Sequence, residues 1–179
     1  MNNDLERLRT LMDRTEIYDC LIRYCRGADR LDREVMLSAY HPDALDDHGA
    51  VILQASEFVD WALDYHQEHQ HTTQHAITNV TYDIQGDEAH VESYYSFWAA
   101  NKAKPDQLAH GRYIDRFERR EGEWRIAARV CITDGILAVD QFPIDPVFQP
   151  ALKSNGPSLR NRADASYERP LIAPRPRAI

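Results

Sequence analysis

Hydrophobic residues in the first part of the chain recur at the spacing of one helix face. The positions that follow this period of three to four residues are Leu8, Leu11, Ile17, Leu21 and Tyr24. We therefore predict a helix over residues 4–27, with Gly27 as its stop signal.

Two shorter helices are predicted next. Residues 33–40 form the first of them, which ends before Pro42. Residues 56–70 form the second, with Ser56 as its N-cap. Between the two, residues 43–53 are expected to form a short irregular strand or hairpin.

From there onward hydrophobic and polar positions alternate, which is typical of strands. The predicted strands cover residues 75–85, 89–100, 109–119 and 124–133, with turns or a polar loop between them. Helices that precede an antiparallel meander indicate the α+β class. We expect a cone, in which the N-terminal helices pack on a curved, mostly antiparallel sheet and enclose a cavity.

The end of the chain has a different composition, with seven prolines in residues 142–177. Little regular structure is expected there. We divide the chain into a cone domain, residues 1–140, and a proline-rich C-terminal extension, residues 141–179. The second half of the extension, from Asn155, is expected to be loose. The first half is expected to dock through four hydrophobic residues, Phe142, Val147, Phe148 and Leu152.

Charge and composition exclude several classes of function. A formal net charge of −8 argues against nucleic acid and against an anionic membrane surface as partners. No apolar run approaches the ~18 residues of a membrane-spanning helix, and residues 1–14 are too polar for a secretory signal. Three cysteines without metal-ligand spacing are expected to be reduced thiols in the cytoplasm. No phosphate-binding glycine loop is present, so no cofactor is predicted.

Asp29 and His75 are the first candidates for chemistry. A carboxylate that accepts a hydrogen bond from one imidazole nitrogen fixes the tautomer and leaves the other nitrogen basic. Such a histidine can take a proton from carbon and return it to a leaving oxygen. From the residue types alone, a surface or capped histidine remains the alternative.

Arg129 is a third candidate because it lies between apolar neighbours on the last predicted strand. Its charge must face solvent or a polar cavity. In a cavity it would stabilise an enolate, a phenolate or a departing oxyanion. A solvent-facing position on an alternating strand is the other interpretation, and the sequence leaves both open.

Aromatic residues fall on the elements expected to line the cone, although core packing is the alternative for each. On the strand 109–119, alternation places Tyr113, Asp115 and Phe117 on the inner face with Gly111, and Arg112, Arg116 and Glu118 on the outer face. We expect Gly111 to leave space for a ligand beside Tyr113.

A group of histidines invites a metal interpretation, which we do not adopt. His66 and His69 are three residues apart on a predicted helix, and His71 and His75 follow. No carboxylate stands at matching spacing and no His-Glu-x-x-His pattern is present, so we predict no metal site.

Three blocks of sequence together resemble a known family. They are Tyr24–Asp47, which contains Gly27-Ala28-Asp29-Arg30 and Tyr40-His41-Pro42-Asp43-Ala44; Gln74–Asn79; and Gly111–Ile126, which contains Tyr113-Ile114-Asp115-Arg116-Phe117 and Gly122-Glu123-Trp124. In order and spacing they resemble the SnoaL-like family of the nuclear-transport-factor-two-like superfamily, whose members include scytalone dehydratase and a hexachlorocyclohexane dehydrochlorinase. The resemblance covers about residues 5–135.

This resemblance implies a cone-shaped fold with an Asp–His dyad at the cavity floor. Asp29 and His75 match the dyad positions, and Arg129 matches an arginine near the leaving group of the dehydrochlorinase. That enzyme has a lysine one turn before its aspartate, where this chain has Tyr24. A hydroxyl there suits proton donation or the binding of a substrate hydroxyl, so dehalogenation is disfavoured.

The expected function is that of a cofactor-independent lyase or dehydratase on a small hydroxylated aromatic or polycyclic substrate. His75 would abstract a proton, Asp29 would orient it, and Tyr24 or Arg129 would assist the departing oxygen. The expected pocket walls are Tyr40, Phe58, Trp61, Tyr95, Phe97 and Tyr113.

Three alternatives stay open. The first is a carbon–carbon lyase that releases formaldehyde from a diaryl diol, and the second is an isomerase. The third is a non-catalytic ligand-binding module, or a structural subunit like the small subunit of ring-hydroxylating oxygenases. In each case we expect a homodimer or homotrimer, because sheets of this fold pair through their convex faces.

Overall fold

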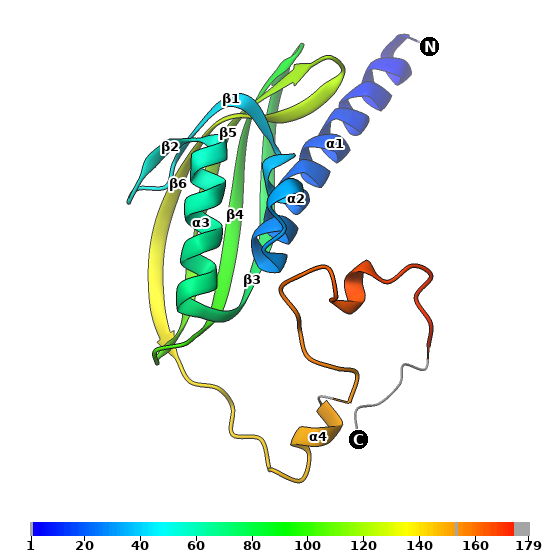
Figure 1. Cartoon of the computed structure of the whole chain (residues 1–179). Helices are drawn as coiled ribbons and strands as arrows, with labels where there is room; N and C mark the ends of the chain where they lie inside the picture. Colours follow the sequence, from blue (N-terminus) through cyan, green and yellow to red (C-terminus); the bar gives the residue numbers. More distant parts are fainter. Residues whose placement is uncertain (1, 153, 174–179) are drawn as a thin grey trace.

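The computed structural model describes residues 2–152 and 154–173, and the side chains of all of these except residues 2, 3 and 152. Figure 1 shows helices packed on one side of a long curved sheet, with an extended C-terminal segment below them. The elements in chain order are α1 (Asn2–Arg30), α2 (Arg33–Leu37), β1 (Tyr40–Asp47), β2 (Ile52–Gln54), α3 (Ala55–His69), β3 (Gln70–Gln85), β4 (Glu88–Asn101), β5 (Asp106–Arg120), β6 (Glu123–Val139), α4 (Gln149–Leu152) and a 3₁₀ turn (Ala165–Tyr167). Among the described residues, no helix has both the length and the hydropathy needed to cross a bilayer.

The sheet has six strands in the order β2-β1-β6-β5-β4-β3. All neighbouring pairs are antiparallel except β1 and β6, which are parallel. The sheet is therefore mixed, and its two edge strands, β2 and β3, do not pair with each other to close it. The predicted α+β class is confirmed, and so is the hairpin expected before α3, which β1 and β2 form.

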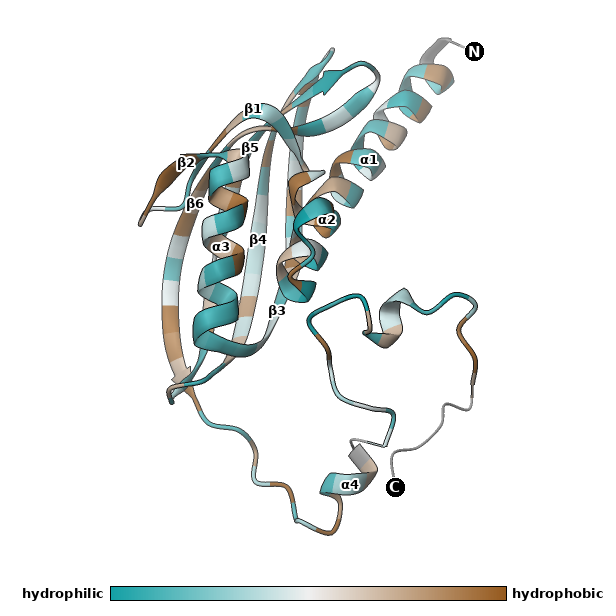
Figure 2. Ribbon diagram, in the orientation of Figure 1, coloured by the Kyte–Doolittle hydropathy of each residue, from teal (hydrophilic) through white to brown (hydrophobic). Residues whose placement is uncertain are grey.

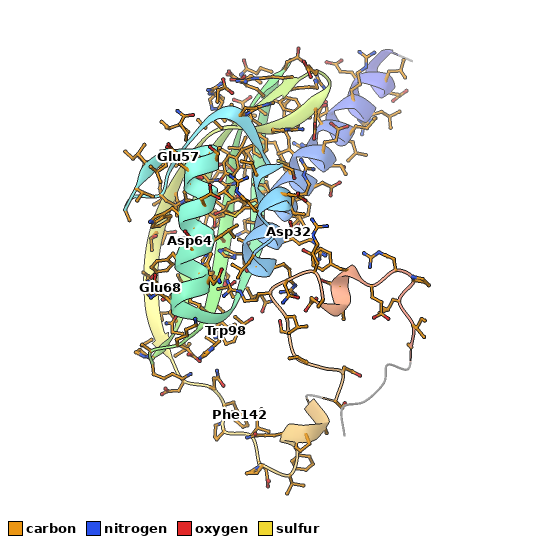
Figure 3. All side chains as sticks on the ribbon, in the orientation of Figure 1. Asp32, Glu57, Asp64, Glu68, Trp98 and Phe142 are labelled. Carbon is orange, nitrogen blue, oxygen red and sulfur yellow. The ribbon has the colours of Figure 1, made fainter. Side chains whose placement is uncertain are left out.

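The core lies between the concave face of the sheet and the helices. Alternate residues of β4, among them Val91, Tyr95 and Phe97, are buried, as the period of a strand requires. Helix α3 buries Phe58 and Val59 against the sheet. It turns hydrophilic residues outward, shown in teal in Figure 2 and including the labelled Glu57, Asp64 and Glu68 of Figure 3.

Helix α1 differs from its prediction at both ends. Leu8 and Leu11 are 54 % and 61 % exposed, because the start of α1 diverges from the sheet (Figure 1). Contact begins at Asp13, which accepts hydrogen bonds from Arg119 and Trp124, and the first fully buried residue is Ile17. The helix also continues through Gly27 to Arg30, so Gly27 is not its stop signal. Gly27 instead allows a close approach of α2, since a Cβ atom there would lie within 2.5 Å of Cα of Met36.

Two smaller predictions about helix ends are also wrong. Helix α2 ends at Leu37, and Tyr40 already belongs to β1. Ser56 is not the N-cap of α3, because the helix begins at Ala55 and Gln54 holds the cap position without a side-chain hydrogen bond.

The prediction for the C-terminal extension is wrong for both halves, because the first half is exposed and the second half contacts the helices. In the first half, Phe142, Val147 and Phe148 are 84 %, 78 % and 62 % exposed, and Figure 3 shows Phe142 away from the sheet. Closely spaced prolines prevent this stretch from forming an element that would hold those side chains on the core. The side chain of Leu152 lies outside the described residues.

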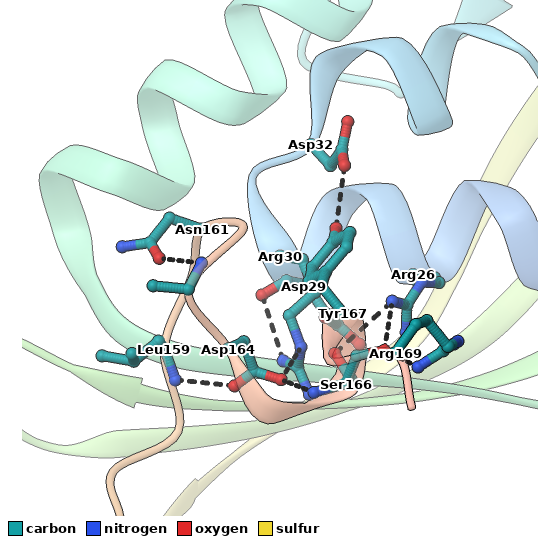
Figure 4. A network of polar contacts seen from close by, with 11 residues as sticks. Arg26, Asp29, Arg30, Asp32, Leu159, Asn161, Asp164, Ser166, Tyr167 and Arg169 are labelled. Atoms are coloured by element: carbon teal, nitrogen blue, oxygen red, sulfur yellow. Dashed lines mark hydrogen bonds and ion pairs between the residues drawn. The ribbon is translucent and has the colours of Figure 1, made fainter. Parts of the chain in front are cut away.

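The second half contacts the helices through polar groups (Figure 4). The Tyr167 hydroxyl donates to Asp32 at 2.8 Å, and Asp164 lies 3.5 Å from Arg30. Arg160 donates to the carbonyl oxygens of His66 and Gln70, at the end of α3. Charged and polar residues in this half find partners at helix ends, which are rich in free backbone groups.

Replacement of Gly27 tests the close approach of α1 and α2. In an ordinary helix, Gly→Ala stabilises by roughly 1 kcal/mol. At Gly27 we expect the opposite sign, a loss of about 1–3 kcal/mol, because the added Cβ meets the backbone of Met36. Urea unfolding of the Gly27→Ala variant measures this change in the free energy of unfolding. Gly135→Ala is the control, because a Cβ atom at Gly135 meets nothing within 4 Å. A more stable Gly27→Ala variant would contradict the contact.

Candidate active site

The last turn of α1 and the start of the long strand β3 meet at Asp29 and His75. One carboxylate oxygen of Asp29 lies 2.7 Å from Nδ1 of His75, and the other accepts the backbone N–H of His75 at 2.9 Å. The two side chains are 13 % and 7 % exposed. Asp29 thus lies within α1, whereas the predicted helix ended at Gly27. The fold brings Asp29 into contact with His75, which is 46 residues further along the chain.

The two hydrogen bonds hold the imidazole ring in one orientation. Because Asp29 occupies Nδ1, the other ring nitrogen, Nε2, remains free to act on a ligand. The ring centroid of His75 lies 4.5 Å from that of Phe97, and His75 lines a partly enclosed cavity of about 180 Å³ between α3 and the sheet. A wider, more open depression of about 570 Å³ reaches the same dyad from outside, between α1, β3 and Ser158 of the extension. We take the inner cavity as the site because it is the more enclosed of the two and is lined by aromatic rings.

Six of the predicted site residues other than the dyad line this cavity. They are Tyr24, Phe58, Trp61, Tyr95, Phe97 and Tyr113. Tyr40 lies behind the wall, 2 % exposed, where its hydroxyl donates to Asp46 at 2.6 Å. Sequence reasoning missed several lining residues, above all His48, His66, Tyr65 and Cys131.

Arg129 also lies behind the wall. Its guanidinium forms two hydrogen bonds with Asp115 on the neighbouring strand, at 2.7 and 2.8 Å, and both side chains are fully buried. It lies over the rings of Tyr24 and Tyr113, 4.3 and 4.1 Å from their centroids. Burial opposes the charge of Arg129, but Asp115 outweighs it and keeps the pKa of Arg129 above its usual value.

The space beside Gly111 is filled by protein. A Cβ atom at Gly111 would meet the carbonyl oxygen of Ile132 and would lie 2.6 Å from the Tyr95 hydroxyl. The Tyr95 ring stacks on Tyr113 with 4.7 Å between centroids. The missing side chain therefore makes room for Tyr95 and not for a ligand, which corrects the prediction.

The predicted histidine group does not converge. His69 is half exposed and His71 is exposed, whereas His66 lines the cavity, with Nδ1 2.6 Å from Oε1 of Gln70. Burial, together with the nearby His75, lowers the pKa of His66 to about 4, so its ring is neutral. In the part of the chain that is described, no cluster of three or more His, Cys, Asp or Glu residues has the arrangement of a metal site.

His48 forms a second Asp–His pair in the same cavity. Its Nδ1 lies 2.7 Å from Oδ1 of Asp46, which is fully buried, and its ring stacks on Phe58. Burial lowers the pKa of His48, but hydrogen bonds with Asp46 and Cys131 outweigh burial and raise the pKa to about 9. The spacing of Asp46 and His48, two residues apart near a strand end, was the signal that could have revealed the pair.

The raised pKa of His48 predicts a pH-dependent stability. A folded-state pKa of about 9, above the ordinary 6.5, contributes stability that is complete below pH 6.5 and is lost as the pH rises towards 9. We expect the free energy of unfolding to fall across this window in the wild type. Urea unfolding at several pH values should show a flatter profile for His48→Gln. Parallel profiles for the two proteins would disprove the assignment.

The buried Arg129–Asp115 pair predicts that a single replacement lowers the free energy of unfolding more than a double replacement does. Arg129→Met leaves Asp115 buried without a partner, and we expect a loss of about 3–5 kcal/mol in the free energy of unfolding. The double variant Arg129→Met, Asp115→Leu removes both charges and should recover most of this loss. If the double variant were no more stable than Arg129→Met, unpaired charge would not be the cause.

Comparison with solved structures places the fold among known proteins. The hexachlorocyclohexane dehydrochlorinase LinA-type3 from Novosphingobium barchaimii superposes with a TM-score of 0.69 at 19 % identity, over 80 % of this chain and 99 % of that one. A protein proposed to be a scytalone dehydratase, from Novosphingobium aromaticivorans, gives 0.67 at 18 % identity, over 77 % and 95 %. A variant of Rv3472 from Mycobacterium tuberculosis, a protein of unknown function, gives 0.64 at 23 % identity, over 70 % and 74 %. At these identities the likeness shows the fold alone.

No curated protein matches the sequence. The model of the SnoaL-like domain, however, matches residues 9–130, which include most of α1, all elements from α2 to β5 and most of the described site. This match spans more than half of the chain and agrees with the resemblance found in the three sequence blocks. The protein belongs to the SnoaL-like domain family.

Proposed function

We propose that the protein is a cofactor-independent lyase that removes water from a small hydroxylated ring compound. The observation that carries this proposal is the pair of hydrogen bonds that Asp29 accepts from the backbone N–H and the ring of His75, at the wall of a partly enclosed aromatic cavity. Elimination needs a base that is aimed at one substrate atom and shielded from water. A histidine with one nitrogen held by a carboxylate and the other free meets that need.

In the proposed step, His75 takes a proton from a substrate carbon through Nε2. The electrons of that C–H bond form a carbon–carbon double bond, and the C–O bond at the adjacent carbon breaks. Asp29 orients the ring and stabilises the imidazolium that forms. Tyr24 lines the cavity with its ring 6.4 Å from that of His75. Burial raises the pKa of Tyr24 well above 10, so its hydroxyl stays a donor that can hold the substrate oxygen.

Arg129 then has an indirect role. Because Asp115 takes two of its N–H groups and the rings of Tyr24 and Tyr113 cover it, Arg129 positions those rings and does not touch the substrate. The aromatic walls expected from the sequence, Phe58, Trp61, Tyr95, Phe97 and Tyr113, would enclose the substrate ring.

The cavity volume favours one ring in the substrate. A cavity of roughly 150 Å³ can hold benzene, and this cavity has about 180 Å³. A polycyclic compound or a diaryl diol would extend out of this cavity towards Tyr65 and Ile136, which line it and are 44 % and 66 % exposed. Single-ring hydroxylated compounds therefore agree best with the site. The names of the dehydratase and dehydrochlorinase neighbours, enzymes of elimination, also support this class of reaction.

A turnover screen tests the proposal. Purified wild type, without added metal or nucleotide, is incubated with single-ring, two-ring and polycyclic hydroxylated compounds, and mass spectrometry follows the loss of water or formaldehyde. We expect loss of water from single-ring compounds. His75→Gln and Asp29→Asn should each be slower by a factor of about 10²–10⁴.

His90→Gln is the matched control, because the His90 side chain is 63 % exposed and does not line the cavity. Equal rates for wild type and His75→Gln would remove His75 as the base. Saturable binding of ring compounds without turnover would show a ligand-binding module in place of an enzyme.

A further inference from the structure

Two of the histidines that line the inner cavity are each held by an aspartate. His75 belongs to the dyad with Asp29, and His48 belongs to the pair with Asp46. Both rings line the same cavity of about 180 Å³, so a ligand bound there has both histidines in its surroundings.

Asp46 lies at a depth where an unpaired carboxylate would be costly. Its side chain is 0 % exposed, one oxygen accepts from the Tyr40 hydroxyl at 2.6 Å, and the other lies 2.7 Å from Nδ1 of His48. Burial raises the pKa of Tyr40 well above 10, so its hydroxyl is neutral. The positive charge that balances Asp46 is therefore the imidazolium of His48.

The other groups around His48 do not compete for this charge. Arg129 on β6 is paired with Asp115 on β5 through Nε and Nη2, and these two charges balance each other. Phe58 of α3 stacks on the His48 ring with 4.7 Å between centroids, and Tyr113 of β5 lies 6.2 Å away. These two rings carry no charge that would replace the imidazolium.

Cys131 of β6 also lies near His48 and lines the cavity. Its thiol lies 3.8 Å from the Tyr95 hydroxyl and is a weak hydrogen-bonding group. Asp46 occupies Nδ1 of His48, so Nε2 is the nitrogen that remains for a ligand. A ligand oxygen in the cavity can therefore receive a charge-assisted hydrogen bond from Nε2.

We propose that His48, held by Asp46, is a cationic oxyanion site of this cavity, which binds an ionised or departing oxygen of a single-ring ligand. This inference rests on the proposed function and identifies the general acid of the proposed reaction. When the C–O bond breaks, its electron pair stays on oxygen, and Nε2 of His48 gives that oxygen its proton to form water. His75 at the same time holds the proton taken from carbon, and solvent returns one proton from His75 to His48 between turnovers.

A binding experiment without turnover tests the site. The probe is 4-nitrophenol, a single ring with one acidic oxygen, whose ionised form absorbs visible light. Titration of wild-type protein into the probe, at a pH below the pKa of the probe in water, should produce the phenolate spectrum. We expect the protein to bind phenolate at least about tenfold more tightly than phenol.

Variants separate the contribution of His48 from those of its neighbours. His48→Gln should abolish the preference for phenolate, a loss of about tenfold or more in relative affinity. Asp46→Asn keeps the imidazole but removes the charge that holds it protonated, so the preference should fall as well. The exposed His90→Gln, at a residue outside the cavity lining, should retain it. Circular dichroism verifies that each variant is folded.

Binding of neutral phenol alone, no binding at all, or an unchanged phenolate preference in His48→Gln would each overturn the proposal. These results are distinct from failure of the proposed function. That failure would appear in the turnover screen as activity that does not depend on His75, and it would leave phenolate binding unchanged.

Discussion

A charge buried between a sheet and its helices must be paired, and in this protein that requirement fixes the interior. Asp115 and Arg129 face each other on adjacent strands, Asp46 holds His48, and Asp29 holds His75. Two of the pairs join different elements, because Asp115 and Arg129 lie on β5 and β6, and Asp29 and His75 lie on α1 and β3. The elements can therefore pack in few other ways without leaving a charge alone in a region of low dielectric.

The three pairs differ in their position relative to the cavity. The Asp115–Arg129 pair is fully covered and supports two tyrosine rings from behind. The two Asp–His pairs lie at the cavity wall, where one ring nitrogen of each histidine is committed to a carboxylate. A similar arrangement, a carboxylate hydrogen-bonded to a nitrogen-bearing side chain, thus lies behind the rings in one place and at the cavity wall in two others.

Much of this architecture could be predicted from the sequence, because alternation and helical spacing are local signals. They located α1, α3 and the four long strands, and the inner face of β5. They could not locate the parallel pairing of β1 with β6, which depends on contacts between residues far apart in the chain. Gly27 was misinterpreted for the same reason, since only the approach of α2 explains it.

The site was harder to predict than the fold. Family resemblance indicated Asp29 and His75, and the structure brings them into contact, but residue type alone left Arg129 undecided between solvent and cavity. It lies in neither, because it is paired with Asp115 inside the core. His48 lies within residues 43–53, a segment that was expected to be an irregular strand or hairpin, so its spacing from Asp46 was not interpreted. The extension was misjudged because hydrophobic residues were weighted above the arginines and the aspartate that do dock.

The Asp29–His75 dyad lies between two spaces, the inner cavity and the wider outer depression. Asp29 borders the outer space, while His75 borders both. The outer depression therefore gives water a route to the dyad that does not pass through the inner cavity. Water can reach the carboxylate from one side while a ligand approaches the imidazole from the other.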